Sequence, residues 1–185
     1  VMAALHARGE LALGQPLHHE SIIGTTFVGE LLEHATVGEG EAAVRGVVPN
    51  LFAAGVARIT IANRTRAKSQ SIAESCLRMG SIAACGLDEA PFDADLVINA
   101  ISAGLAGEMP ALDDRVLTRA RAVYDMIYAD TATPFLRWAR DHGVAGEDGL
   151  GMLVEQAAES FALWRGIRPD TQAVITALRS PQALQ

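Results

Sequence analysis

Short apolar runs alternate with longer amphipathic segments along most of this chain. From residue 42 onward, apolar stretches of strand length are separated by segments with helical spacing. The predicted strands cover residues 57–62, 81–85, 94–100 and 122–128. The predicted helices cover residues 42–54, 66–79, 134–142, 150–165 and 169–179, and the third of them has Thr133 as its expected N-cap and Pro134 in its first turn. Strands buried on both faces read as continuous apolar runs, so this pattern predicts an α/β fold with a doubly wound, Rossmann-like parallel sheet.

The first forty residues have a different pattern. Residues 1–13 are small and apolar like the end of a helix, and residues 21–32 combine β-branched and aromatic residues as a strand does. We therefore expect an N-terminal appendage of a helix and a β-strand over residues 1–40, followed by the Rossmann-like domain over residues 41–185.

Composition narrows the class of partner. With 22 acidic and 15 basic residues the net charge is −7, which disfavours a nucleic-acid partner. No apolar run reaches the roughly 20 residues that span a bilayer, and the first residues lack the pattern of a signal peptide, so we expect a cytoplasmic protein without membrane contact. Cys76 and Cys85 lack the spacing of a disulfide framework or a zinc site, and we interpret them as buried hydrophobic residues. No metal site is predicted.

The end of the second predicted strand carries a cationic turn. Asn63, Arg64 and Thr65 follow the apolar run directly, and Lys68, the only lysine in the chain, lies four residues after Arg64. In a βαβ nucleotide site the adenosine ribose sits at this strand tip, where an acidic residue would suit a free 2′-hydroxyl and cations suit a 2′-phosphate. The turn therefore favours NADP over NAD, and the alternative is an ordinary solvated loop.

A glycine-rich turn precedes the first predicted helix. Gly38 and Gly40 have a GxG spacing, and with Ala42 at the helix start they would bring backbone amides close to a pyrophosphate. However, residues 34–37 look too short and too polar for a buried first strand, and two glutamates flank Gly40. The turn binds phosphate if residues 35–37 take the central position of the sheet, and it loses its anchor if they pair elsewhere.

Three further segments follow predicted strands. Ser102 lies after the strand over residues 94–100, in a run of small residues that is either a cofactor contact or an ordinary loop. Tyr128 ends the strand over residues 122–128 and is either a ligand contact or a core tyrosine. Gly149 permits close approach before the helix over residues 150–165, and the amide of Gln156 can hydrogen-bond vicinal hydroxyls. The stripe on that helix is expected in the core: Leu153, Ala157, Phe161 and Trp164.

From about residue 44 to residue 178 the chain resembles the C-terminal, NADP-binding half of the shikimate dehydrogenase family. The matching motifs, in the family's order, are Asn63-Arg64-Thr65 with Lys68, Asn99-Ala100, Tyr124-Asp125-Met126-Ile127-Tyr128 with Thr133-Pro134-Phe135-Leu136, and Asp148-Gly149-Leu150-Gly151-Met152 with Gln156-Ala157-Ala158. The chain departs from the family at Ile101, where Thr or Ser is usual, and in the glycine turn, which lacks the usual Gly-Ala-Gly-Gly-Ala sequence.

The resemblance implies a function for these positions. It implies that Asn63, Arg64, Thr65 and Lys68 hold the 2′-phosphate of NADP, that Met126 and Gly149 border the nicotinamide, and that Tyr128 and Gln156 contact shikimate. The implied reaction is reversible hydride transfer between NADPH and the C3 carbonyl of 3-dehydroshikimate, a step of the chorismate pathway of aromatic amino acid biosynthesis.

The first 43 or so residues resemble a different family, the proline racemases and hydroxyproline epimerases. The segments that match are Met2 to Leu11 and His19 to Phe27. The matching part of that family begins after its second catalytic cysteine, and no cysteine precedes Cys76 here, so racemase chemistry is not expected. The join would lie within residues 37–48, and the chain is interpreted as a chimera of two fragments that arose by genomic fusion, by assembly error or by deliberate joining.

The resemblance leaves the activity of this chain open. Shikimate dehydrogenases use a Lys and Asp pair from an N-terminal domain, and the only lysine here already belongs to the 2′-phosphate motif, so no catalytic residue is assigned. The first hypothesis is the NADP-binding domain of a shikimate dehydrogenase-like oxidoreductase with a small-molecule substrate. The second is a non-catalytic NADP-binding or interaction module that pairs with a partner chain or a second copy. The third is an inactive chimeric fragment.

Overall fold

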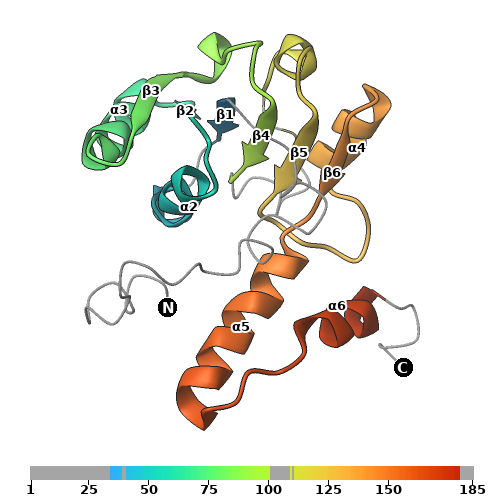
Figure 1. Cartoon of the computed structure of the whole chain (residues 1–185). Helices are drawn as coiled ribbons and strands as arrows, with labels where there is room; N and C mark the ends of the chain where they lie inside the picture. Colours follow the sequence, from blue (N-terminus) through green and yellow to red (C-terminus); the bar gives the residue numbers. More distant parts are fainter. Residues whose placement is uncertain (1–33, 39–40, 101–108, 110, 180–185) are drawn as a thin grey trace.

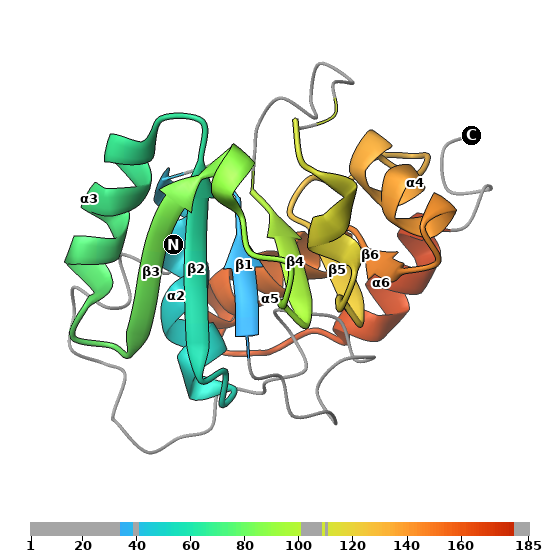
Figure 2. The ribbon, with the colours of Figure 1, turned by 90° about the horizontal axis from the view of Figure 1, so that it is seen from above.

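Six parallel strands form one sheet in the part of the chain that the structure describes (Figure 1). The computed structural model describes residues 34–38, 41–100, 109 and 111–179. The strands are β1 (His34–Val37), β2 (Arg58–Asn63), β3 (Ser81–Gly86), β4 (Leu96–Asn99), β5 (Ala122–Asp125) and β6 (Ala145–Glu147). They lie in the order β3-β2-β1-β4-β5-β6 (Figure 2). The predicted doubly wound, Rossmann-like sheet is therefore confirmed.

Helices and short 3₁₀ turns connect the strands. The α-helices are α2 (Glu41–Ala53), α3 (Arg66–Cys76), α4 (Pro134–Asp141), α5 (Leu150–Arg165) and α6 (Thr171–Arg179), and the 3₁₀ turns are η2 (Leu87–Glu89) and η4 (Asp114–Leu117). Thr133 caps α4 as its sequence predicts, because its hydroxyl accepts a hydrogen bond from Leu136 N at 3.2 Å and Pro134 occupies the first turn. The five predicted helices are confirmed, with ends that differ by at most a few residues.

Residues 34–37 take the central position in the sheet, which is the first of the two alternatives that the sequence left open, although the run looked too short for a strand. His34–Val37 forms β1 at the centre of the sheet, where Ala35 lies opposite Ile59 of β2 and opposite Leu96 of β4. Four residues are enough here because parallel neighbours on both sides supply backbone hydrogen bonds to the strand. The strand order reverses between β1 and β4, and this reversal is the place where open α/β sheets bind ligands.

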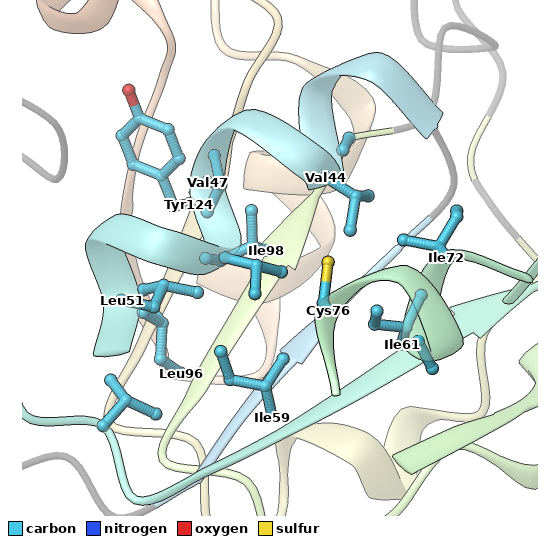
Figure 3. Packing of buried hydrophobic residues seen from close by; sticks show 14 of the residues in the cluster. Val44, Val47, Leu51, Ile59, Ile61, Ile72, Cys76, Leu96, Ile98 and Tyr124 are labelled. Carbon is cyan, nitrogen blue, oxygen red and sulfur yellow. The ribbon is translucent and has the colours of Figure 1, made fainter. Parts of the chain in front are cut away.

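Apolar side chains fill both faces of the sheet. On one face, Ile59, Ile61 and Ile98 pack against α2 and α3 (Figure 3). On the other face, Val97 and Val123 pack in a second cluster with residues of α4 and η4. Consecutive strand residues point to opposite faces, so coverage of both faces explains the continuous apolar runs in the sequence.

The structure also bears on shorter elements and on the two cysteines. The short strand β6 was missed, because Ala-Gly-Glu has no apolar run. The strand predicted over residues 122–128 ends at Asp125, because the chain leaves the sheet there. Cys76 is 3% exposed and buried as predicted, whereas Cys85 is only partly buried, and burial raises the pKa of its thiol. The predicted appendage over residues 1–40 lies almost entirely outside the described residues.

The predicted core stripe of α5 was also wrong. Leu153 is 40% exposed, Phe161 is 45% exposed and Trp164 is 79% exposed, and Ala157 is exposed as well. The buried side of the helix consists of Leu150, Val154 and Ala158. Figure 1 shows α5 running away from the sheet after its first turns, so packing at its start and against α6 sets which side is covered.

Among the described residues, no helix combines the length and the apolar character that crossing a membrane requires.

Candidate functional site

The predicted site residues lie along one edge of the sheet. All six strands are parallel, so their carboxyl ends share an edge, and the predicted residues that the structure describes follow β1, β2, β5 and β6 directly or within two turns of helix. Gly38 follows β1, and its N–H donates to Ile98 O of β4 at 2.8 Å. The exit of β1 is thus fixed against β4 at the reversal of strand order.

A compact turn joins β2 to α3. Asn63 is 6% exposed, and its Oδ1 accepts a hydrogen bond from Thr65 N at 2.8 Å, which closes the turn. Thr65 is the N-cap of α3, yet its side chain makes no capping hydrogen bond, and the first turn of α3 contains no acidic residue. The side chains of Arg64, Thr65 and Lys68 are exposed beside this helix start. Two exposed cationic residues therefore lie within three positions of the N-cap of α3 at the tip of β2, an arrangement that suits an anion.

An ion pair joins the start of α3 to η2, the turn that directly follows β3. Arg66 Nη1 lies 2.5 Å from both carboxylate oxygens of Glu89, and Glu89 Oε2 accepts from Gly86 N at 3.0 Å. The Gly86 amide, together with Arg66, lowers the pKa of the Glu89 carboxyl. The fully buried Ser69 adds a second tie, because its hydroxyl lies 2.8 Å from Cys85 O. Sequence reasoning missed these ties, which fix α3 on β3 and leave Arg66 engaged with Glu89.

The segments that follow β5 and β6 are in contact with each other. Met126 N donates to Asn99 O at 2.9 Å, and Gly149 N donates to Ile127 O at 3.1 Å. A Cβ atom on Gly149 would lie only 2.3 Å from Met126 O, so only glycine fits this approach. The structure thus brings together the two residues predicted to border a nicotinamide.

A buried carboxylate organises the exit of β5. Asp125 is 0% exposed, and its Oδ1 accepts from Asn99 Nδ2 at 3.0 Å and from Ile127 N at 3.2 Å. Its Oδ2 accepts from Thr133 Oγ1 at 2.5 Å. Burial raises the pKa of Asp125, while these three donors oppose the shift. Polar residues at the ends of two adjacent apolar strands were the sequence signal for this network.

We expect the stability difference between the unmodified chain and D125N to depend on pH. The folded-state pKa of Asp125 lies above its ordinary value of 3.8, so the folded chain binds this proton more tightly than the unfolded chain does. The stability that the folded chain gains from binding this proton is fully present at pH values below the ordinary pKa of 3.8. It is lost as pH rises through the raised pKa of Asp125 in the folded chain.

D125N has no proton to bind at this position, and all other titratable groups are common to both proteins. The unfolding free energy of the unmodified chain minus that of D125N should therefore increase as pH falls from about 7 to about 4. Urea denaturation at a series of pH values measures this difference, and a constant difference would contradict the assignment.

A second carboxylate fixes the residue before Gly149. Asp148 is 9% exposed, and its Oδ1 accepts from Leu150 N at 3.1 Å and from Arg179 Nη2 at 2.6 Å. This contact joins the last residue of α6 to the start of α5.

The remaining predicted residues are less informative. Tyr128 is 53% exposed, so its interpretation as a core tyrosine was wrong, and Gln156 lies on an exposed part of α5. Ala42 lies in the first turn of α2, and Gly40 and Ser102 lie outside the described residues. In the described part of the chain, no three His, Cys, Asp or Glu residues gather in a way that would hold a metal ion.

Comparisons with known proteins find a likeness to shikimate dehydrogenases over most of this chain. The family model described as "Shikimate 5'-dehydrogenase C-terminal domain" matches residues 149–179. The shikimate dehydrogenase (NADP(+)) of Alkalilimnicola ehrlichii is 51% identical over 144 residues, which are 77% of this chain and 53% of that enzyme. This chain is similar to shikimate dehydrogenases over about half of their length.

Solved structures agree with this similarity. The Ael1 enzyme from Pseudomonas putida matches with a TM-score of 0.70 and 40% identity, over 82% of this chain and 56% of that one. The shikimate dehydrogenase from Thermotoga maritima matches with a TM-score of 0.64 and 30% identity, over 82% of this chain and 58% of that one. The resemblance predicted from the motifs is confirmed at this level.

A second family model, for proline racemase, matches residues 1–66. This range begins with the predicted appendage and extends beyond residue 43, through β1, α2 and β2. Those three elements nevertheless form the first βαβ unit of the same parallel sheet as β3 to β6.

Proposed function

We propose that this chain is the NADP-binding part of a shikimate dehydrogenase-like oxidoreductase. The observation that carries the proposal is the β2–α3 turn, where Arg64, Thr65 and Lys68 are exposed beside a helix start without a side-chain cap. A 2′-phosphate is a dianion of the right size for such a turn, and the ribose of a dinucleotide lies at this strand tip. The relatives named above as NADP(+) enzymes support the same choice of cofactor.

The rest of the edge suits the other end of the same cofactor. Met126 and Gly149 lie in contact where β5 and β6 leave the sheet, and the absence of a side chain on Gly149 lets these two loops close on each other beside the proposed ring site. NADPH would supply a hydride when bound. The β2–α3 turn would hold its 2′-phosphate, and Met126 and Gly149 would border its nicotinamide ring.

Two exposed polar residues suit a polyhydroxylated substrate. The phenol of Tyr128 and the amide of Gln156 can donate to and accept from ring hydroxyls. We assign both to contacts with shikimate or 3-dehydroshikimate, a small-molecule substrate in keeping with the names of the relatives.

Catalysis needs a group that we do not assign to this chain. Reduction of a ketone creates an alkoxide that must receive a proton, and a lysine near the reacting oxygen suits this task. Lys68 is the only lysine in the sequence, and it lies at the phosphate end of the proposed site. We therefore expect these residues to bind NADPH, and to reduce dehydroshikimate only together with a segment outside them that supplies the proton donor.

Two measurements on the purified chain test the proposal. Titration with NADPH, followed by nicotinamide fluorescence, should show saturable binding that is tighter than NADH binding. Incubation with shikimate and NADP should then show no reduction of NADP by the chain alone. Absence of binding to both dinucleotides would contradict the proposal. Reduction of NADP by the chain alone would contradict the view that these residues include no proton donor.

A second candidate is an inactive chimera. It is favoured by the match of residues 1–66 to the proline racemase model, beside the match of residues 149–179 to the shikimate dehydrogenase model. The chain spans about half the length of the curated relatives it matches. A chimera of this kind would show neither dinucleotide binding nor a cooperative unfolding transition, whereas an NADP-binding module shows both.

A further inference from the structure

We propose that Asp125 is a positioning residue for the nicotinamide end of the site. It joins the exits of β4 and β5 to the start of α4, and it thereby holds the segment that borders the ring. This inference rests on the proposed NADP-binding function and adds a residue that makes no contact with the ring itself.

The backbone of the segment after β5 is held at three points. Met126 N donates to Asn99 O, Ile127 N donates to Asp125 Oδ1, and Gly149 N donates to Ile127 O. The first and last of these bonds join backbone to backbone, whereas the middle one depends on the side chain of Asp125. Removal of the carboxylate therefore releases the N–H of Ile127, which lies between the two backbone bonds.

The same carboxylate also fixes the far end of the segment. Asp125 Oδ2 accepts from Thr133 Oγ1, and that hydroxyl in turn accepts from Leu136 N as the cap of α4. The segment from Met126 to Thr133 is therefore anchored at both ends through Asp125. Tyr128, the proposed substrate contact, lies within it.

The chemistry of the network requires an acceptor at this position. The Asn99 amide, the Thr133 hydroxyl and the Ile127 N–H all donate to Asp125, so both carboxylate oxygens serve only as acceptors. An asparagine has the same shape, can keep its oxygen toward Asn99 and Ile127, and can donate from its nitrogen to the Thr133 hydroxyl, so it preserves most of the network. Alanine removes every acceptor at this position together with a buried charge, so we expect D125A to fold while the segment loses its fixed geometry.

Binding of two ligands distinguishes a positioning role of Asp125 from a general loss of structure in the variant. NADPH reaches both ends of the site, whereas 2′,5′-ADP reaches only the adenosine end. We expect D125A to raise the NADPH dissociation constant about tenfold and to change that of 2′,5′-ADP by less than about twofold. D113A is the matched control, because Asp113 precedes the amino end of β5 and its carboxylate binds Arg115 of η4, away from the carboxyl edge of the sheet. D113A should leave both dissociation constants unchanged.

Thr133 variants give an independent check. T133V removes the donor to Asp125 and should weaken NADPH in the same selective way, and T133S, which keeps the hydroxyl, should restore it. Equal weakening of both ligands by D125A would show a merely structural role and overturn the inference, as would NADPH binding that D125A leaves unchanged.

Amide hydrogen exchange tests the role of Asp125 independently of the proposed NADP-binding function. In D125A, the exchange of Ile127 N–H should quicken while that of Lys68 N–H stays the same. If the unmodified chain bound no dinucleotide, the proposed function would fail, and this exchange result would still decide whether Asp125 holds the segment. Unchanged exchange at Ile127 would overturn the inference.

Discussion

Replacement of both Arg64 and Lys68 by alanine is expected to weaken NADPH binding about 100-fold and to leave NADH binding within about twofold. Each cation at the β2–α3 turn would form a charge-assisted contact with the 2′-phosphate, which NADH lacks. The two residues lie four apart on either side of the start of α3, so both reach the same anion. Titration of the double variant with each dinucleotide measures the two effects.

The control must remove the same charge at another place. Arg78 lies beyond the end of α3 and Arg140 lies in the last turn of α4, and both are exposed. The R78A/R140A variant therefore loses two positive charges away from the carboxyl edge, and it should bind NADPH as the unmodified chain does. A similar loss of affinity in both double variants would mean that net charge, and not a phosphate site, governs binding.

Alanine at position 149 is expected to cost about 1–3 kcal/mol of unfolding free energy and to weaken NADPH. Its Cβ would lie 2.3 Å from Met126 O and 2.7 Å from Met126 C, so the backbones after β5 and β6 would have to separate. The φ of Gly149 is −75°, which alanine adopts freely, so the effect comes from contact and not from backbone conformation.

Gly151 is the matched control for this variant. It lies two residues further on, in the first turn of α5, and a Cβ added there meets nothing within 4 Å. G151A should stabilise the chain by about 0.5–1 kcal/mol, because alanine loses less conformational entropy in a helix. Urea denaturation of both variants gives the comparison, and a G149A protein as stable as G151A would refute the close approach of the two loops.

Local chemistry made part of this fold predictable. The cationic turn after β2 and the cap of α4 each depend on residues a few positions apart, so sequence alone located both. Burial of the strands on both faces produced continuous apolar runs, and these gave the parallel sheet. The predicted roles of Asn63, Arg64, Thr65 and Lys68 stay predictions until a ligand is measured.

Contacts between distant segments account for what sequence reasoning missed. His34–Val37 is a strand because β2 and β4 bond to it, and nothing in its four residues indicates this. The bond between Asn99 and Asp125 joins the ends of β4 and β5, which only the sheet order brings together. The buried side of α5 is formed by Leu150, Val154 and Ala158, and helical periodicity alone did not identify it.

The central claim is that the turn after β2 binds a 2′-phosphate, and adenosine 2′,5′-bisphosphate and adenosine 5′-monophosphate differ by that one group. Isothermal titration of the unmodified chain with each compound tests the claim without involving the nicotinamide or catalysis. We predict that the bisphosphate binds at least about tenfold more tightly, and that the advantage shrinks as salt is added. Equal affinity for the two compounds would contradict the claim.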